Sequence, residues 1–198
     1  MIFRDADDPS EPEPGLEKRL QSLEQQAEIA LPGFDARFFH RAGDLCADAR
    51  EDRAVSYYGR AIDAYLRAGR YNAAGAVCRK LLGISPGAVR ARCTLAWLSI
   101  GKGQVSEAHR DVDEYVRAAV AAGDADLARE QIRMMAEATH DRPLRSLLAD
   151  HLQQLDDPET AERLRTDPGD RDDGEAEALW SRALRAALMG PEDLRGGD

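Results

Sequence analysis

The apolar residues of this chain recur at alternating spacings of three and four over most of its length. This spacing places them on one face of an α-helix, so it predicts a series of amphipathic helices. Glycine, proline and short polar runs separate the segments and end the helices. The predicted helices span residues 16–30, 34–49, 54–66, 71–82, 88–100, 105–121, 127–135, 144–155, a short stretch from residue 158, and 175–189. Asp157 is the predicted cap of the short helix, with Pro158 in its first turn. The pattern therefore predicts an all-α fold.

Two of the predicted helical pairs, in residues 55–88 and 89–122, have the same layout. Gly69 lies between the helices of the first pair, and Gly103 takes the same place in the second. Glycine readily adopts the left-handed conformation at a helix C-terminus, so both glycines predict tight turns. The apolar positions after each glycine also correspond: Tyr71, Ala74, Cys78 and Leu81 in one pair, and Val105, Ala108, Val112 and Tyr115 in the other. A repeat of this kind indicates stacked helical hairpins.

The two pairs resemble tetratricopeptide repeats (TPR). The first pair matches the family pattern through Tyr58, Tyr65, Gly69, Tyr71, Ala74 and Pro86, and the second through Leu95, Ala96, Gly103, Ala108 and Val112. The match is incomplete, because Ile62, Arg92 and Val120 stand where the family has a small residue, an aromatic residue and a proline. The resemblance implies a right-handed α-solenoid of about three hairpins with capping helices at both ends.

Composition and pattern divide the chain into five parts. Residues 1–14 are rich in acids and prolines and predict a disordered arm, because they carry too little apolar surface to offset the entropy of ordering. Residues 15–165 form the predicted repeat domain, in which the third hairpin is degenerate. Residues 166–174 have the composition of a linker, 175–189 form an amphipathic C-terminal helix, and 190–198 form a flexible tail.

Each terminal helix carries an apolar stripe with two interpretations. The N-terminal stripe is either a cap on its own chain or a short coiled-coil seam between two copies. The C-terminal stripe is either a fixed cap or a helix that docks on the scaffold and plugs its groove. Homodimerisation through these stripes is the alternative function. The residues that define it are Leu16, Leu20, Leu23, Trp180 and Leu184.

Composition also limits the partners. The formal net charge is −10, whereas nucleic-acid binding needs a cationic surface that displaces counterions, so we do not expect DNA or RNA. The N-terminus has no apolar signal region and no apolar run is long enough to span a bilayer, so we do not expect the protein to associate with a membrane. The three cysteines are widely spaced, which argues against structural disulfides. We expect a soluble, cytoplasmic protein.

No motif indicates catalysis or metal binding. The histidines, at positions 40, 109, 140 and 151, lack the four-residue spacing of a helical zinc site. Residues 83–87 match the GxSxG pattern of a nucleophile elbow, but helical patterns flank them and Pro86 has no N–H for an oxyanion. Cys78 and Cys93 fall within or beside apolar helical faces, where thiols are usually buried and inert. The sequence therefore predicts no enzyme activity, no metal and no cofactor.

The resemblance implies a concave groove lined by the first helix of each hairpin. The residues of these helices that point off the apolar stripe are our predicted partner-binding residues: Arg60, Asp63, Arg67, Arg90, Thr94 and Trp97. Arginines beside a tryptophan suit an acidic peptide or a C-terminal carboxylate, through bidentate contacts and stacking. The Asn and Lys pattern of the family's carboxylate clamp is absent from these helices. The sequence predicts a protein–protein interaction scaffold, or adaptor, that binds a partner protein or peptide.

Overall fold

The computed structural model describes residues 15–28, 34–166, 180 and 184. Over these residues the chain is all-helical and has no strand, in agreement with the predicted fold class. The helices are α1 (Leu16–Glu28), α2 (Phe34–Asp48), α3 (Arg53–Arg67), α4 (Tyr71–Ile84), α5 (Val89–Gly101), α6 (Val105–Ala122), α7 (Ala125–Ala138), α8 (Arg142–Gln154) and α9 (Pro158–Thr166). They follow the predicted order, and their ends differ from the predicted ends by a few residues.

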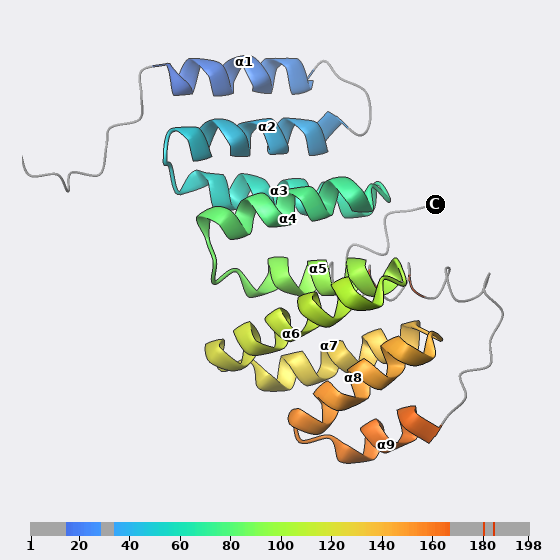
Figure 1. Cartoon of the computed structure of the whole chain (residues 1–198). Helices are drawn as coiled ribbons and strands as arrows, with labels where there is room; N and C mark the ends of the chain where they lie inside the picture. Colours follow the sequence, from blue (N-terminus) through green and yellow to red (C-terminus); the bar gives the residue numbers. More distant parts are fainter. Residues whose placement is uncertain (1–14, 29–33, 167–179, 181–183, 185–198) are drawn as a thin grey trace, which may run out of the picture.

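The helices pack in chain order. Figure 1 shows α1 to α9 one below another, with successive helices running in opposite directions. Each helix contacts the next one in sequence, and α5 also contacts α7 while α6 contacts α8. As a result, the turns α3–α4, α5–α6 and α7–α8 lie along the same edge of the molecule. None of the described helices is long and apolar enough to cross a membrane.

Left-handed glycines form the turns of the two repeated hairpins. Gly69, between α3 and α4, and Gly103, between α5 and α6, each have a φ angle of +66°. This conformation is strained for residues with a Cβ atom, which explains the glycine at both places. Across the first turn Arg70 N donates to Tyr65 O at 2.8 Å and satisfies a carbonyl at the end of α3. The prediction of both turns is confirmed.

The α7–α8 hairpin is built differently. Its turn contains no glycine. Instead, Thr139 is extended and Asp141 Oδ1 accepts a hydrogen bond from Leu144 N at 3.0 Å, which caps α8. Asp157 caps α9 in the same way and accepts from Thr160 N at 3.3 Å, as its position before Pro158 predicted. This hairpin therefore has a capping side chain in its turn, where the two repeated hairpins have a left-handed glycine.

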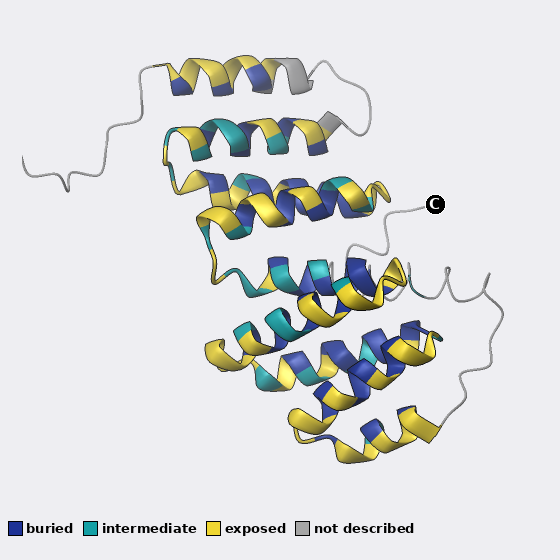
Figure 2. Cartoon of the chain, in the orientation of Figure 1, coloured by how far each residue is buried: buried dark blue, intermediate teal, exposed yellow. Residues whose placement is uncertain are grey.

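Small and aromatic side chains fill the interfaces between helices. Ala74 of α4 and Ala108 of α6, at corresponding positions, are fully buried, which lets their neighbours approach closely. Tyr58 packs on Gly43 of α2, where an added Cβ would lie 2.6 Å from the tyrosine ring. Figure 2 shows that buried residues follow the helix sides that face a neighbour, while exposed residues cover the outside.

Helix α1 closes the N-terminal end of this core. Leu16, Leu20 and Leu23 are each at most 6% exposed, and α1 packs on α2. The apolar stripe is therefore covered within the chain, as the cap interpretation requires. A dimer through the same stripe would need α1 to leave α2.

Several predicted parts lie outside the described residues. These are the arm 1–14, the tail 190–198, and the linker and C-terminal helix apart from Thr166, Trp180 and Leu184. Thr166 is the last residue of α9. Leu184 is 1% exposed and belongs to the hydrophobic core, and Trp180 is half-buried against it.

Candidate functional site

Arginines gather on the exposed side of α3. Arg60, Asp63 and Arg67 are three and four residues apart, which places them on one face of the helix. The guanidinium of Arg60 lies over the Phe39 ring of α2, with 4.0 Å between Cζ and the ring centroid. This cation–π contact orients the guanidinium, although the Arg60 residue as a whole is exposed. Arg67 is also exposed and forms no ion pair with any described residue.

Arg90 extends this surface onto α5. Its Nη2 donates to Asp63 Oδ1 at 2.5 Å, and its Nη1 donates to Asp63 Oδ2 at 3.4 Å. The Arg90 side chain remains 57% exposed, compared with 26% for Asp63. We name Arg60, Asp63, Arg67 and Arg90 the arginine face. It brings together four of the predicted partner-binding residues and carries three guanidinium groups for one carboxylate.

The other two predicted partner-binding residues are not on this face. Thr94 is 1% exposed, and its hydroxyl donates to Arg90 O at 3.0 Å. Trp97 is fully buried, and its Nε1 donates to Gln131 Oε1 of α7 at 2.8 Å. The prediction that Thr94 and Trp97 line an open groove is corrected by their burial. Trp97 packs against α7, whereas Thr94 lies near Cys78 of α4.

A pocket at the edge of the molecule holds the second tryptophan. The Trp180 and Tyr71 rings pack edge to face, with centroids 5.1 Å apart. Trp180 Nε1 donates to Trp97 O at 3.3 Å. The indole lies directly over Gly101, since a Cβ added there would overlap the Trp180 ring. Only glycine at position 101 leaves room for this ring.

A cavity of about 1020 Å³ opens beside Trp180. Its walls come from the turns α3–α4, α5–α6 and α7–α8, which share one edge in Figure 1. We name this cavity and its tryptophan the Trp180 pocket. Its lining residues include Arg70, Tyr71, Lys102, His140, Leu144 and Trp180. Its volume is at the upper end of those usual for ligand sites.

A polar cluster joins α2 to α4 across α3. Lys80 Nζ donates to Asp44 Oδ1 at 2.7 Å and contacts His40 Nε2 at 2.9 Å, and Tyr58 Oη donates to Asp44 Oδ1 at 2.8 Å. Burial opposes ionisation of Asp44, but the hydrogen bonds from Lys80 and Tyr58 outweigh it and hold the pKa of Asp44 below its usual value. Burial and the Lys80 charge lower the pKa of His40. This cluster links helices and contains no activated nucleophile.

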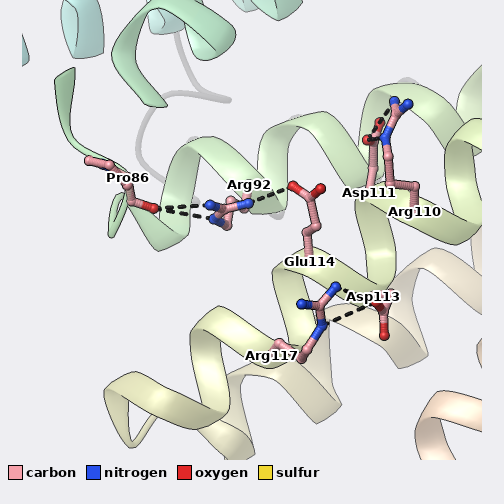
Figure 3. Close-up of polar contacts among 7 residues, drawn as sticks. All are labelled: Pro86, Arg92, Arg110, Asp111, Asp113, Glu114 and Arg117. Carbon is pink, nitrogen blue, oxygen red and sulfur yellow. Dashed lines mark hydrogen bonds and ion pairs between the residues drawn. The ribbon is translucent and has the colours of Figure 1, made fainter. Parts of the chain in front are cut away.

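Charged residues of α5 and α6 pair with one another within the chain (Figure 3). Arg92 donates to Pro86 O at 3.1 Å and to Glu114 at 2.6 Å, so it ties the α4–α5 turn to α6. On α6, Arg117 pairs with Asp113 four residues away, and Arg110 pairs with its neighbour Asp111.

The cysteines considered for catalysis are buried, and the serine lies next to the end of a helix. Burial raises the pKa of Cys78 and of Cys93 to about 12, so both thiols are protonated at neutral pH. Ser85 is the C-cap residue directly after α4, and α5 begins at Val89, so the GxSxG match connects two helices. Among the described residues no three His, Cys, Asp or Glu side chains are grouped to hold a metal ion.

Sequence reasoning did not find the Trp180 pocket or the cluster around Asp44. A signal for the pocket exists, because Gly101 stands where the first hairpin has Arg67 and so exposes the backbone of α5. Trp180 lies more than two repeats beyond Gly101 in the chain, so periodicity cannot connect them. Asp44 and Lys80 are 36 residues apart on different helices, and no motif marks their contact.

Comparison with protein-family models, with curated proteins and with solved structures finds no match for this chain. The arginine face and the Trp180 pocket are therefore the basis for assigning a function.

Proposed function

We propose that the chain is a cytoplasmic protein–protein interaction scaffold that binds an acidic segment of a partner protein on its arginine face. In this proposal α2 to α8 form a right-handed α-solenoid of TPR-like hairpins, capped by α1 and by the C-terminal segment. The proposal rests chiefly on one observation. Three exposed guanidinium groups, those of Arg60, Arg67 and Arg90, lie with the Asp63 carboxylate on α3 and α5, in a chain whose formal net charge is −10.

The geometry of this face suits carboxylates. Guanidinium groups bind carboxylates through paired N–H donors, and the Arg90–Asp63 contact already shows such a pair within the chain. The Phe39 ring holds Arg60 in place, which reduces the side-chain entropy lost when a partner binds. A partner carboxylate next to Arg67 would find a guanidinium with no ion pair among the described residues. These features support an acidic peptide over a neutral one.

The test is affinity capture with the full chain from an extract of the cells that produce it, followed by titration of the purified partner. Reversing two charges of the arginine face, with Arg60→Glu and Arg90→Glu, is expected to weaken binding about tenfold or more, because like charges then face each other. The matched control is Arg110→Glu with Arg117→Glu, which changes the net charge equally on exposed arginines of α6 (Figure 3). The control is expected to bind as the unaltered chain does.

Two outcomes would count against the proposal. Equal weakening by both double variants would mean that net charge alone controls binding. Recovery of no protein except the chain itself, together with a mass that doubles with concentration, would favour homodimerisation. A cross-link from a photoreactive residue at position 67 to an acidic segment of the partner would supply direct support.

A further inference from the structure

A small cavity lies between helices α4, α5 and α6, which follow one another in the stack (Figure 1). Helices α4 and α6 both pack on α5, and each of the two contributes side chains to the cavity wall. All of the lining residues lie between positions 72 and 111. The cavity volume is about 190 Å³, which is roughly the space of six water molecules. The cavity is therefore large enough for a small molecule.

The charged residues of this cavity have opposite signs and come from separate helices. Arg79 on α4 and Lys102 directly after α5 supply two cations, while Glu107 and Asp111 on α6 supply two anions. Neither Arg79 nor Lys102 forms an ion pair or a side-chain hydrogen bond with any described residue. Opposite charges thus line one cavity without pairing across it.

Asp111 is the most buried of these charged residues. It is 8% exposed, and Arg110 Nε and Nη2 both donate to its Oδ1, at 3.2 and 3.1 Å (Figure 3). Its Oδ2 accepts no hydrogen bond from a described residue. Burial removes hydration from a carboxylate, so a further cationic donor stabilises it. Asp111 therefore has an oxygen available for an ammonium group in the cavity.

The guanidinium of Arg79 lies close to the backbone of Gly75. A Cβ added at Gly75 would lie 3.9 Å from Arg79 Nη1 and 3.4 Å from Leu98 Cδ1. The glycine therefore leaves a space that a guanidinium bounds on one side and a leucine methyl group on the other. A guanidinium binds a carboxylate through paired N–H donors, and a methyl group packs favourably on aliphatic carbon.

We propose that this cavity binds a free α-amino acid with a small aliphatic side chain. The ammonium group of the amino acid donates to Asp111, and its carboxylate accepts from Arg79 and Lys102. Its side chain lies over Gly75 and against Leu98. Separated charges of both signs favour a zwitterion over a simple anion or cation. The site goes beyond the proposed function, because it shares no residue with the arginine face.

The test is isothermal titration calorimetry of the full chain with L-valine and two matched probes. Isobutylamine is valine without its carboxylate, and isovalerate is valine without its ammonium group. The unaltered chain is expected to bind valine at least about tenfold more tightly than either probe, because each probe leaves one set of charges in the cavity without a partner.

Substitutions in the cavity test its residues. Asp111→Asn keeps the shape of the side chain but removes its charge, so it is expected to weaken valine binding about tenfold or more. Asp113→Asn is the matched control, because Asp113 is also on α6 and pairs with an arginine but does not line the cavity. Gly75→Leu is expected to abolish binding by filling the space beside Leu98. Its control is Gly83→Leu, since a Cβ at this position of α4 meets nothing within 4 Å.

Both control variants are expected to bind valine as the unaltered chain does, and circular dichroism establishes that each variant is folded. The proposal is overturned if the unaltered chain does not bind valine at millimolar concentration, or if either probe binds as tightly as valine. It is also overturned if a folded Gly75→Leu chain still binds valine, or if Asp113→Asn weakens binding as much as Asp111→Asn does.

The outcome is separable from that of the proposed function. Arg60→Glu with Arg90→Glu is expected to leave valine binding unchanged, because neither arginine lines the cavity. Loss of valine binding in this double variant would contradict a site between α4, α5 and α6. Failure of the chain to capture an acidic partner would leave the valine titration unaffected.

Discussion

Helices α3 and α5 take the same place in successive hairpins, yet corresponding positions have opposite surroundings. When Gly69 is aligned with Gly103, Arg60 corresponds to Thr94, Asp63 to Trp97, and Arg67 to Gly101. On α3 the three side chains form most of the arginine face. On α5 the first two are buried and the third position lies beneath the Trp180 indole.

The difference comes from the neighbours rather than from the helices themselves. Helix α7 packs on α5 and supplies Gln131 to the Trp97 ring nitrogen, and Trp180 covers the end of α5. Helix α3 keeps the corresponding side exposed. Position in a repeat therefore determines where a side chain points, while the next element in the stack decides whether solvent or protein meets it. The four predictions below test this comparison, from the largest expected effect to the smallest.

The largest difference is expected between alanine substitutions at the paired positions 97 and 63. Trp97→Ala removes a fully buried ring and leaves Gln131 Oε1 with only the weak donor Cys93 Sγ, so it should lower the free energy of unfolding by about 3–5 kcal/mol. Asp63→Ala removes a partly exposed ion pair and should cost at most about 1 kcal/mol. Urea unfolding followed by circular dichroism measures both. Similar costs at the two positions would contradict the burial difference.

The turns of the two repeated hairpins should respond alike to substitution, although the surfaces of α3 and α5 differ. Gly69→Ala and Gly103→Ala each place a Cβ on a backbone with φ of +66°, so each should destabilise the chain by about 1–2 kcal/mol. Gly59→Ala is the control, because Gly59 lies inside α3 and a Cβ there meets nothing within 4 Å. It should stabilise the chain by about 0.5–1 kcal/mol. A large difference between positions 69 and 103 in thermal unfolding would show that the hairpins are not equivalent even in their turns.

The third prediction concerns Lys80 of α4, whose position corresponds to that of Glu114 in α6. Lys80 reaches back to Asp44 of α2, so Asp44→Asn should cost about 1 kcal/mol at pH 7, given the exposure of the pair. The pKa of Asp44 is lowered in the folded chain from the ordinary value of 3.8, so its stabilising effect is present above that pH and is lost as the pH falls through the folded pKa.

The stability of the Asp44→Asn variant and of the unaltered chain should therefore converge as the pH falls below 3.8. Thermal unfolding at a series of pH values measures the convergence. A difference that stayed constant from pH 7 to pH 3 would mean that Asp44 acts through packing rather than charge.

The smallest effect is expected for the ion pair between Arg90 and Asp63. A double-mutant cycle with alanine should give a coupling energy of about 0.2–1 kcal/mol that decreases with added salt. The cycle for Arg92 and Glu114 is the comparison, because Arg92 is only 21% exposed and is also held by Pro86 O (Figure 3). That coupling should be larger and less sensitive to salt. A larger and less salt-sensitive coupling energy for Arg90 and Asp63 would mean that Arg90, rather than Arg92, helps to hold its neighbouring helices together.

Much of the fold followed from local sequence. The spacing of apolar residues predicted the order of α1 to α9, and the glycines at 69 and 103 predicted the hairpin turns with their positive φ angles. The Asp157–Pro158 pair predicted the cap of α9. These features depend on residues within a few positions of one another, because helix periodicity, capping and turn conformation are local properties of the backbone.

The tertiary structure alone decided which of the helical faces stay exposed. The pattern of α5 does not show that Thr94 and Trp97 are buried, because a tryptophan off the apolar stripe is compatible with either a groove or a core. Gly101 meets Trp180, and Asp44 meets Lys80, although each pair is far apart in the sequence. Burial depends on which elements pack together, so the sequence by itself determined the helices and their turns, whereas the surfaces available to a partner arose only when the helices came into contact.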